Sequence, residues 1–366
     1  MKSTRPALAV VVLLLLLAVT ARAELPEDLR RKIDERVARF LEKSGAPGIS
    51  VAIGVDNELC FEQGYGLADV ENQVPASAES IYRLASISKM LTGVAVLQLV
   101  DARELDLTLP IQSYVPGFPE KQAPITCDLL LKHQSGIRHY KGTEIRSNAH
   151  FLHVRDSFGV FQDDPLLFDP GERFSYTTYG FNVLGAAIEG ASGEDYVGYV
   201  QKHIAEPCGM TTLQADNPFV IIPHRAAGYR KQGQKLLNDI AVDVSNKVPG
   251  GGWCSTAGDL VRFAGALNSG KLLRPRTLEA MWTPRTTIDG EMTRVGYGCF
   301  IDVRDDDRLI SHSGGQPKVS TFLVFSPAKK VAVAVMCNLR ESSPKSLAMD
   351  LIELVGADAI EPAAAE

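Results

Sequence analysis

Several short patterns that mark common enzyme and binding classes are missing from this sequence. It contains no Cys-x-x-Cys pair, which disfavours a zinc ribbon or a thioredoxin-type redox site. It has no His-Glu-x-x-His metal-binding helix and no phosphate-cradling Gly-x-x-x-x-Gly-Lys-Ser/Thr loop. The Gly-x-Ser-x-Gly elbow of α/β-hydrolases is absent as well. We therefore expect no metal ion, no other cofactor and no α/β-hydrolase fold.

Long apolar runs are also scarce, because only residues 7–20 form one. This run is short for a membrane span, which needs about 20 apolar residues. It follows the basic residues Lys2 and Arg5 and precedes the small-x-small sequence 21–23. We predict that residues 1–23 are a signal peptide and that the mature protein is exported, either periplasmic or secreted, with no stable membrane span. The alternative is an uncleaved anchor.

Excess positive charge is lacking too. The formal net charge of −6 becomes −9 once Lys2, Arg5 and Arg22 are removed with the leader. Nucleic-acid binding requires a basic face, so we do not expect a nucleic-acid partner. The chain is longer than one typical domain, and its 45% hydrophobic content is ample for a packed core, which makes two lobes plausible.

Six cysteines remain in the mature chain, and their pairing cannot be deduced from the sequence. Export makes disulfides chemically possible, but buried free thiols are an equally good interpretation in a chain of this size. They are Cys60, Cys127, Cys208, Cys254, Cys299 and Cys337.

Hydrophobic periodicity predicts strands near both ends of the chain and helices in the middle. The predicted strands are 48–55, 59–67, 295–303, 308–312, 319–325 and 331–336. The predicted helices are 26–42, 86–103, 178–189, 194–203, 259–267 and 345–354. A helix capping box is expected at Thr256–Asp259.

This order predicts an α+β fold with one antiparallel sheet that is built from both chain ends and flanked by helices. The sheet lobe would comprise residues 24–118 and 250–366, and a mostly helical lobe would be inserted between them at residues 119–249. Pockets tend to form where two such lobes meet. We therefore expect the functional site in the cleft between the lobes.

The most informative pattern is Ser86-x-x-Lys89 at the start of an apolar helical run. Residues three apart on a helix share one face, so the lysine amine can reach the serine hydroxyl. In apolar surroundings lysine tends toward its neutral form, which can act as a base for the serine. The same spacing recurs at Ser326 and Ser342, but both of those lie at chain breaks beside a proline. The competing interpretation of the first match is two polar residues that cap a core helix.

Two later segments offer the other groups that serine chemistry needs. Tyr176 follows a Pro-Gly turn and precedes a helix, so its hydroxyl can exchange protons with Ser86 and with a leaving group. The segment from His312 to Gly315 ends a strand, and its glycines allow close approach of the backbone. The amides of Ser86 and Gly315 would form an oxyanion hole. Each segment alone also fits a plain structural role.

Together these segments resemble the serine beta-lactamase and penicillin-binding-protein-like superfamily. The match is closest to its class C-like branch, which includes family VIII esterases, D-aminopeptidases and the beta-lactamase-like serine protease of animal mitochondria. The resemblance spans nearly the whole mature chain and includes the segments Leu129–Ile137 and Gly250–Leu260. It implies that Ser86 is the acyl-accepting nucleophile, with Lys89 as its proton partner and Tyr176 as the general base and acid.

The third motif of the family, Lys-Thr-Gly, corresponds to His312, Ser313 and Gly314 in this chain. The resemblance places Gly314, Gly315, Ser313 and Thr178 around the substrate and the oxyanion, and makes His312 a fourth catalytic residue. Thr178 stands where the family usually has an asparagine, and His312 stands where the antibiotic-hydrolysing members have a lysine. A neutral histidine holds a substrate carboxylate less well than lysine does. Both departures favour an esterase or a peptidase over an efficient beta-lactamase.

The sequence therefore predicts an exported serine hydrolase that cleaves an ester or amide bond of a small-molecule or peptide substrate through an acyl-enzyme. The alternative is a weakly catalytic or non-catalytic protein of the cell envelope that binds or senses penicillin or peptidoglycan. The sequence leaves the oligomeric state open.

Overall fold

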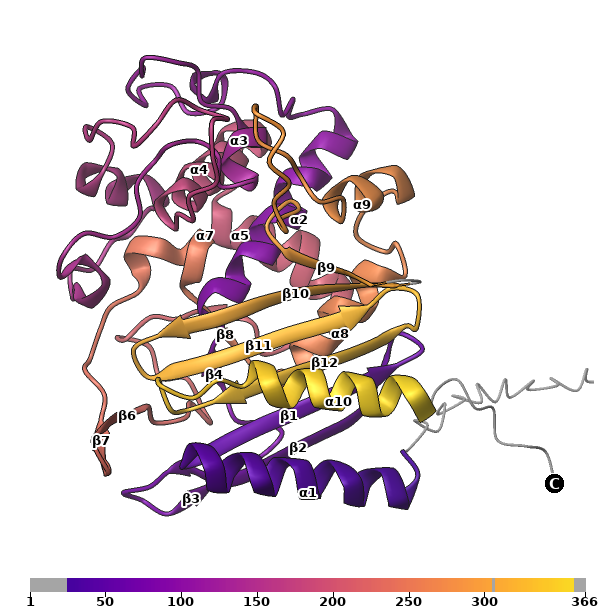
Figure 1. Ribbon diagram of the computed structural model, residues 1–366. Coiled ribbons are helices and arrows are strands. Elements are labelled where there is room, and N and C mark those ends of the chain that lie inside the picture. The colour runs from indigo at the N-terminus through magenta and orange to yellow at the C-terminus, as the bar shows by residue number, and fades with distance from the viewer. Residues whose placement is uncertain (1–24, 305–306, 359–366) are drawn as a thin grey trace, which may run out of the picture.

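The computed structural model describes residues 25–304 and 307–358. The predicted signal peptide, residues 1–23, lies outside these described residues. Figure 1 shows the sheet in the lower half of the molecule and a mostly helical region above it.

The main sheet has seven antiparallel strands in the order β3-β2-β1-β12-β11-β10-β9. Strands from the two ends of the chain meet at its centre, where Ile49 of β1 pairs with Cys337 of β12. This arrangement confirms the predicted α+β fold with a sheet built from both chain ends. The strands are β1 Gly48–Val55, β2 Glu58–Asp69, β3 Val74–Pro75, β9 Phe300–Arg304, β10 Asp307–Gln316, β11 Val319–Ser326 and β12 Val331–Cys337.

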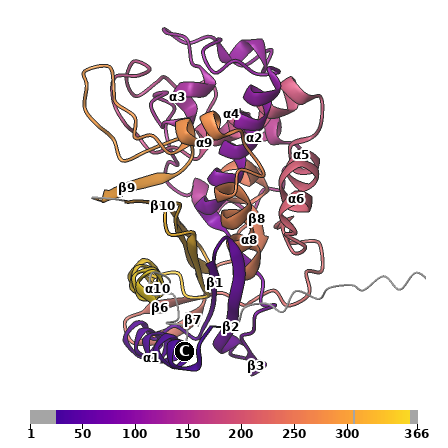
Figure 2. The same cartoon turned by 90° about the vertical axis from the view of Figure 1, so that its right-hand side faces the viewer.

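Helices cover both faces of the sheet, which explains why its central strands are apolar throughout rather than alternating. Every residue of β11 and β12 is buried. The terminal helices α1 Glu27–Ser44 and α10 Lys345–Asp358 lie along one face, and α8 Ala257–Asn268 lies on the other (Figures 1 and 2). The hairpin between β1 and β2 turns at Asp56 and Asn57, whose φ angles of +53° and +69° suit a tight turn of the type that joins twisted strands.

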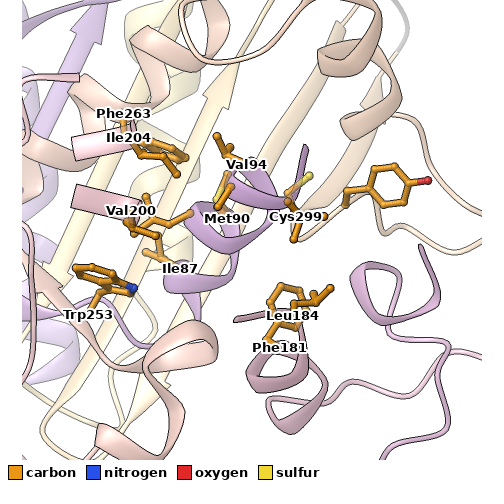
Figure 3. Packing of buried hydrophobic residues seen from close by; sticks show 14 of the residues in the cluster. Ile87, Met90, Val94, Phe181, Leu184, Val200, Ile204, Trp253, Phe263 and Cys299 are labelled. Atoms are coloured by element: carbon orange, nitrogen blue, oxygen red, sulfur yellow. The ribbon is translucent and has the colours of Figure 1, made fainter. Parts of the chain in front are cut away.

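A second core surrounds helix α2 Ser88–Ala102, which is buried along almost its whole length. Figure 3 shows how Ile87, Met90 and Val94 pack against side chains from several other elements. Among the described residues, the segment Ala85–Ala102 is the one stretch long and apolar enough to cross a membrane, and 72% of it is buried inside the molecule. A buried core helix can have the length and hydrophobicity of a membrane span by composition alone.

The other elements lie mostly around α2 or between it and the sheet. The remaining α-helices are α3 Cys127–Leu131, α4 Tyr179–Ser192, α5 Tyr196–Val200, α6 Glu206–Cys208, α7 Val248–Gly251 and α9 Pro275–Met281. The short 3₁₀ or π turns are η1 Ala85–Ile87, η2 Ile111–Ser113, η3 Glu144–Arg146, η4 Val154–Val160, η5 Gln201–Ala205 and η6 Ser245–Lys247. The minor strands are β4 Tyr82–Arg83, β5 Gln214–Ala215, β6 Tyr229–Gln232, β7 Lys235–Asn238 and β8 Trp253–Ser255.

Three local expectations need correction. The strand predicted at 295–303 begins only at Phe300, because residues 296–298 form a tight bend in which Gly298 has a φ of +76°. The helix predicted from residue 86 is preceded by the 3₁₀ turn η1, so α2 itself starts at Ser88. The capping box at Thr256 is half present: the threonine accepts a hydrogen bond from the Asp259 amide, but the Asp259 carboxylate pairs with other groups.

All six cysteines are free thiols in the described structure, and five of them are buried. This agrees with the interpretation of the cysteines as small packing residues rather than as a disulfide framework.

Candidate active site

The site is built around Ser86, which lies in turn η1 directly before helix α2. The preceding residue, Ala85, has a φ of +48°, a left-handed conformation that costs a non-glycine residue about 1–3 kcal/mol. Contacts on both sides hold this turn in place: the Leu84 amide donates to the Trp253 carbonyl at 2.8 Å, and Thr321 donates to the Leu84 carbonyl at 3.1 Å. The fold therefore fixes the serine on a constrained turn at the edge of the sheet.

Lys89 lies one turn further along and is fully buried. Its Nζ is 3.3 Å from Ser86 Oγ, 3.1 Å from Thr178 Oγ1 and 2.5 Å from the Gly250 carbonyl oxygen. Burial, with a smaller contribution from the charge of Lys247, lowers the pKa of Lys89 well below its usual range. A neutral amine has two hydrogens and one lone pair. Thr178 and the Gly250 carbonyl lie at the shorter distances and can accept these two hydrogens, which leaves the lone pair available to Ser86.

Tyr176 comes from the segment between the Pro170-Gly171 turn and helix α4. A hydrogen bond joins its side chain to Ser86, and its ring centroid lies 4.8 Å from Lys89 Nζ. Burial raises the pKa of its phenol, so the hydroxyl keeps its proton at neutral pH. The structure thus brings Ser86, Lys89 and Tyr176 together. Their protonation favours Lys89 as the first base and Tyr176 as a group that relays a proton.

Histidine rings fix the position of Tyr176. The ring of His133 stacks on the Tyr176 ring with centroids 4.4 Å apart, and His139 meets it edge-on at 5.6 Å. The backbone is also held, because the Thr177 amide donates to His133 Nδ1 and the Thr178 amide donates to His139 Nδ1. The sequence analysis assigned neither histidine a role at the tyrosine, so this support of Tyr176 was missed.

Thr178 is buried against the amine of Lys89 and does not face open space. Its side chain is 2% exposed, and its hydroxyl accepts from Lys89 and shares a hydrogen bond with Tyr140. The sequence placed Thr178 among the groups around the substrate. In the structure its hydroxyl is committed to orienting the lysine.

The third motif lies on strand β10, and its side chains alternate between the two faces of the sheet. His312 and Gly314 are buried, whereas Ser313 and Gly315 are exposed. A Cβ atom added at Gly314 would lie 2.1 Å from Thr321 Oγ1 and 2.3 Å from the Leu84 carbonyl oxygen, so only glycine fits against the serine turn. A Cβ atom added at Gly315 would meet nothing within 4 Å. Pairing between β9 and β10 ends at Ser311, so β9 does not cover the edge of β10 from His312 onward.

His312 points into the same enclosed space as the tyrosine. Its ring centroid lies 6.3 Å from that of Tyr176, and its Nδ1 is 2.7 Å from the Ser313 carbonyl oxygen, which it can meet only as a donor. Burial, together with the charge of Lys89, lowers the pKa of His312 to about 3. Burial likewise lowers the pKa of His139 to about 4. Both rings are therefore uncharged at neutral pH.

Backbone groups that carry no sequence signature complete the site. The Gly250 carbonyl accepts from Lys89, and a Cβ atom added at Gly250 would lie 2.5 Å from Thr178 Cγ2, so a larger residue would push this carbonyl away. The fold resemblance included the Gly250–Gly252 run but assigned it no role. The described residues contain no group of three or more His, Cys, Asp or Glu side chains that could hold a metal ion.

The family model described as Beta-lactamase matches residues 31–357. The chain belongs to the beta-lactamase family. It is 30% identical to the mouse mitochondrial serine beta-lactamase-like protein LACTB, in an alignment that covers 86% of this chain and 78% of that protein.

Two solved structures illustrate the fold of this family member. The octameric penicillin-binding protein homologue from Pyrococcus abyssi is 26% identical with a TM-score of 0.77, and the match covers 89% of this chain and 77% of that one. The D-amino acid amidase from Ochrobactrum anthropi SV3 is 21% identical with a TM-score of 0.77, covering 91% and 98% of the two chains, and it supports the fold alone. The recognised superfamily and its fold are thus confirmed, and the family supports a serine hydrolase.

Proposed function

We propose that this protein is an exported serine hydrolase that cleaves an ester or amide bond through an acyl-enzyme on Ser86. The observation that carries the proposal is the position of the Lys89 amine. Its Nζ lies 3.1 Å from Thr178 Oγ1 and 2.5 Å from the Gly250 carbonyl oxygen, which can accept its two hydrogens, and 3.3 Å from the Ser86 hydroxyl. Such an arrangement is a base placed within reach of a nucleophile.

In the proposed acylation step, Ser86 Oγ bonds to the carbonyl carbon of the substrate while its proton moves to Lys89 Nζ. The carbonyl oxygen becomes an oxyanion that the amides of Ser86 and Gly315 would stabilise. The carbon–leaving-group bond then breaks as the leaving group takes a proton from Tyr176, which Lys89 reprotonates. Water reverses the sequence: it loses a proton to the same pair of groups, attacks the acyl carbon and releases the acid and Ser86.

The uncharged state of His312 bears on the substrate class. A buried imidazole whose pKa is about 3 supplies no positive charge for a substrate carboxylate at neutral pH. We therefore propose substrates whose reacting bond is an ester or amide without a required carboxylate nearby, and inefficient turnover of beta-lactams.

The direct test is hydrolysis of p-nitrophenyl butyrate by the purified protein without residues 1–23, compared with its Ser86→Ala variant. We expect turnover by the unaltered protein and a loss of at least about a thousandfold in the variant. Nitrocefin, assayed under the same conditions, should be hydrolysed far more slowly than the ester. Ester hydrolysis that survives in Ser86→Ala would refute the assignment of the nucleophile, and binding without any product release would favour the envelope-sensor alternative.

A further inference from the structure

A second lysine, Lys247, lies buried beside the catalytic lysine without an assigned role. Its side chain is 2% exposed, and within the described ranges it forms no ion pair. The negative charge of Asp243 acts on Lys247, but the Asp243 carboxylate is already paired with His150 at 2.7 Å. An unpaired buried cation is costly and so invites a functional explanation.

Three hydrogen bonds to carbonyl groups of residues 246, 249 and 250 fix the segment that carries Lys247. Asn182 donates to the Asn246 carbonyl at 2.7 Å, Thr92 donates to the Pro249 carbonyl at 2.6 Å, and Lys89 itself donates to the Gly250 carbonyl at 2.5 Å. The segment that positions Lys247 therefore also binds the amine of Lys89. The fold therefore fixes the position of Lys247 relative to the site.

A chain of contacts through one ring and one hydroxyl links the two amines. Lys247 Nζ lies 5.0 Å from the ring centroid of Tyr140, and the Tyr140 side chain is hydrogen-bonded to Thr178. Thr178 Oγ1 is in turn 3.1 Å from Lys89 Nζ. Thr178 is buried and Tyr140 is partly buried, so water screens the two amines less along this path than bulk solvent would. A charge on Lys247 therefore acts directly against a charge on Lys89.

We propose that Lys247 is a positioning residue whose positive charge keeps Lys89 in its uncharged, proton-accepting form. This proposal rests on the proposed function of the site. The contact with Tyr140 stabilises the charge without neutralising it.

The other charged groups around Lys247 are Arg83, Asp243 and the ring of His139. Arg83 is paired with Asp216 at 2.5 Å, and burial together with Arg83 lowers the pKa of Lys247 to about 8. Lys247 thus remains largely charged at pH 7. The pKa of His139 is about 4, so this ring carries no charge above about pH 5 and does not account for changes there.

The test is the pH dependence of Ser86 labelling by a fluorophosphonate probe, which needs no knowledge of the natural substrate. Removing the charge in Lys247→Met should raise the pKa of Lys89, so that the acidic limb of the labelling rate moves to higher pH by about one unit. One unit below the wild-type midpoint, labelling should then be about tenfold slower. Lys247→Arg keeps a positive charge and should retain the wild-type limb.

Lys318→Met is the control, because Lys318 is a half-buried lysine that also lies near Arg83 but does not act on Lys89. It should leave the limb unmoved. Lys247→Gln provides a second neutral variant if the methionine variant does not fold. A limb that coincides with wild type in a folded neutral variant, or a loss of rate that is equal at all pH values, would overturn the proposal. Absence of Ser86 labelling in the unaltered protein would instead refute the proposed function.

Discussion

At the scale of single residues, the site depends on how the hydrogens of one amine are distributed. Lys89 is a base for Ser86 only while Thr178 and the Gly250 carbonyl accept its two hydrogens. Burial, together with the charge of Lys247, favours the neutral amine, and these acceptors orient it. The strained turn at Ala85 then holds the serine hydroxyl within reach of the Lys89 amine.

Replacing Thr178 by valine tests this orientation directly. The variant has nearly the same shape but no hydroxyl, so one hydrogen of the Lys89 amine loses its acceptor and the lone pair turns away from Ser86. A net hydrogen bond contributes about 1 kcal/mol, so we expect kcat/KM for an ester substrate to fall about fivefold to tenfold. Thr178→Ser, which keeps the hydroxyl, should remain close to wild type. Equal rates for the valine and serine variants would show that the hydroxyl does not orient the lysine.

At the scale of elements, strand β10 does two jobs on its two faces. The buried face packs Gly314 against the serine turn, and the exposed face presents Gly315 beyond the end of the pairing with β9. Neither glycine has a positive φ, so the backbone of both positions tolerates other residues. The two positions differ only in the space available for a side chain.

This difference gives a matched pair of variants. In Gly314→Ala the new methyl group would lie within 2.3 Å of two oxygen atoms, so the strand and the serine turn must separate. We expect a loss of about 1–3 kcal/mol in the free energy of unfolding, read as a lower melting temperature, together with loss of activity. Gly315→Ala adds its methyl group to open space and should melt near wild type. Similar melting of the two variants would contradict the close packing of β10 on the turn.

The elements also show what sequence reasoning can reach. Strands β1, β11 and β12 were predictable because a continuous apolar run of this length, bounded by turns, fits a doubly covered strand. The run at 295–299 looked the same, yet it is a bend: its apolar residues are buried against α2, and a Cβ atom added at Gly298 would lie 2.8 Å from the Lys89 carbonyl oxygen. Burial, not strand pairing, accounts for that composition.

The candidate site shows the same limit. Ser86, Lys89 and Tyr176 could be named because spacing and the order of motifs identify them. The Gly250 carbonyl and Lys247 could not, because a backbone acceptor has no residue signature and the packing of residues 246–250 against α2 and α4 is a tertiary contact. Thr178 was recognised as unusual, but its partner became clear only from the fold.

At the scale of the whole molecule, the site lies where sheet and helices meet, and it is enclosed by uncharged rings. The pKa values of His139 and His312 are lowered to about 4 and about 3, and that of His133 is also lowered well below its usual range by burial. Below about pH 6.5, these histidines therefore bind protons in the unfolded chain but stay unprotonated in the folded protein. The stability that these rings contribute is complete above that pH and is lost as the pH falls toward 4.

We accordingly expect the free energy of unfolding to decrease between pH 6.5 and 4 with a slope of at least about 1.4 kcal/mol per pH unit, which corresponds to one proton taken up on unfolding. Urea denaturation at several pH values, with the slope m checked for constancy, measures this dependence. His139→Gln should make the slope shallower, whereas replacement of the exposed His224 should not. A flat profile over this range would show that the histidines are accessible to protons in the folded state.

The most direct test of the central claim, that a neutral Lys89 activates Ser86, is to map the site of fluorophosphonate labelling by tandem mass spectrometry at neutral pH. We expect one adduct, on Ser86, in the unaltered protein and at least about a hundredfold slower labelling of the same residue in Lys89→Met. The neighbouring Ser88 is fully buried and serves as an internal reference that should stay unmodified. An adduct on any other residue, or labelling of Ser86 at an undiminished rate without the lysine amine, would contradict the account.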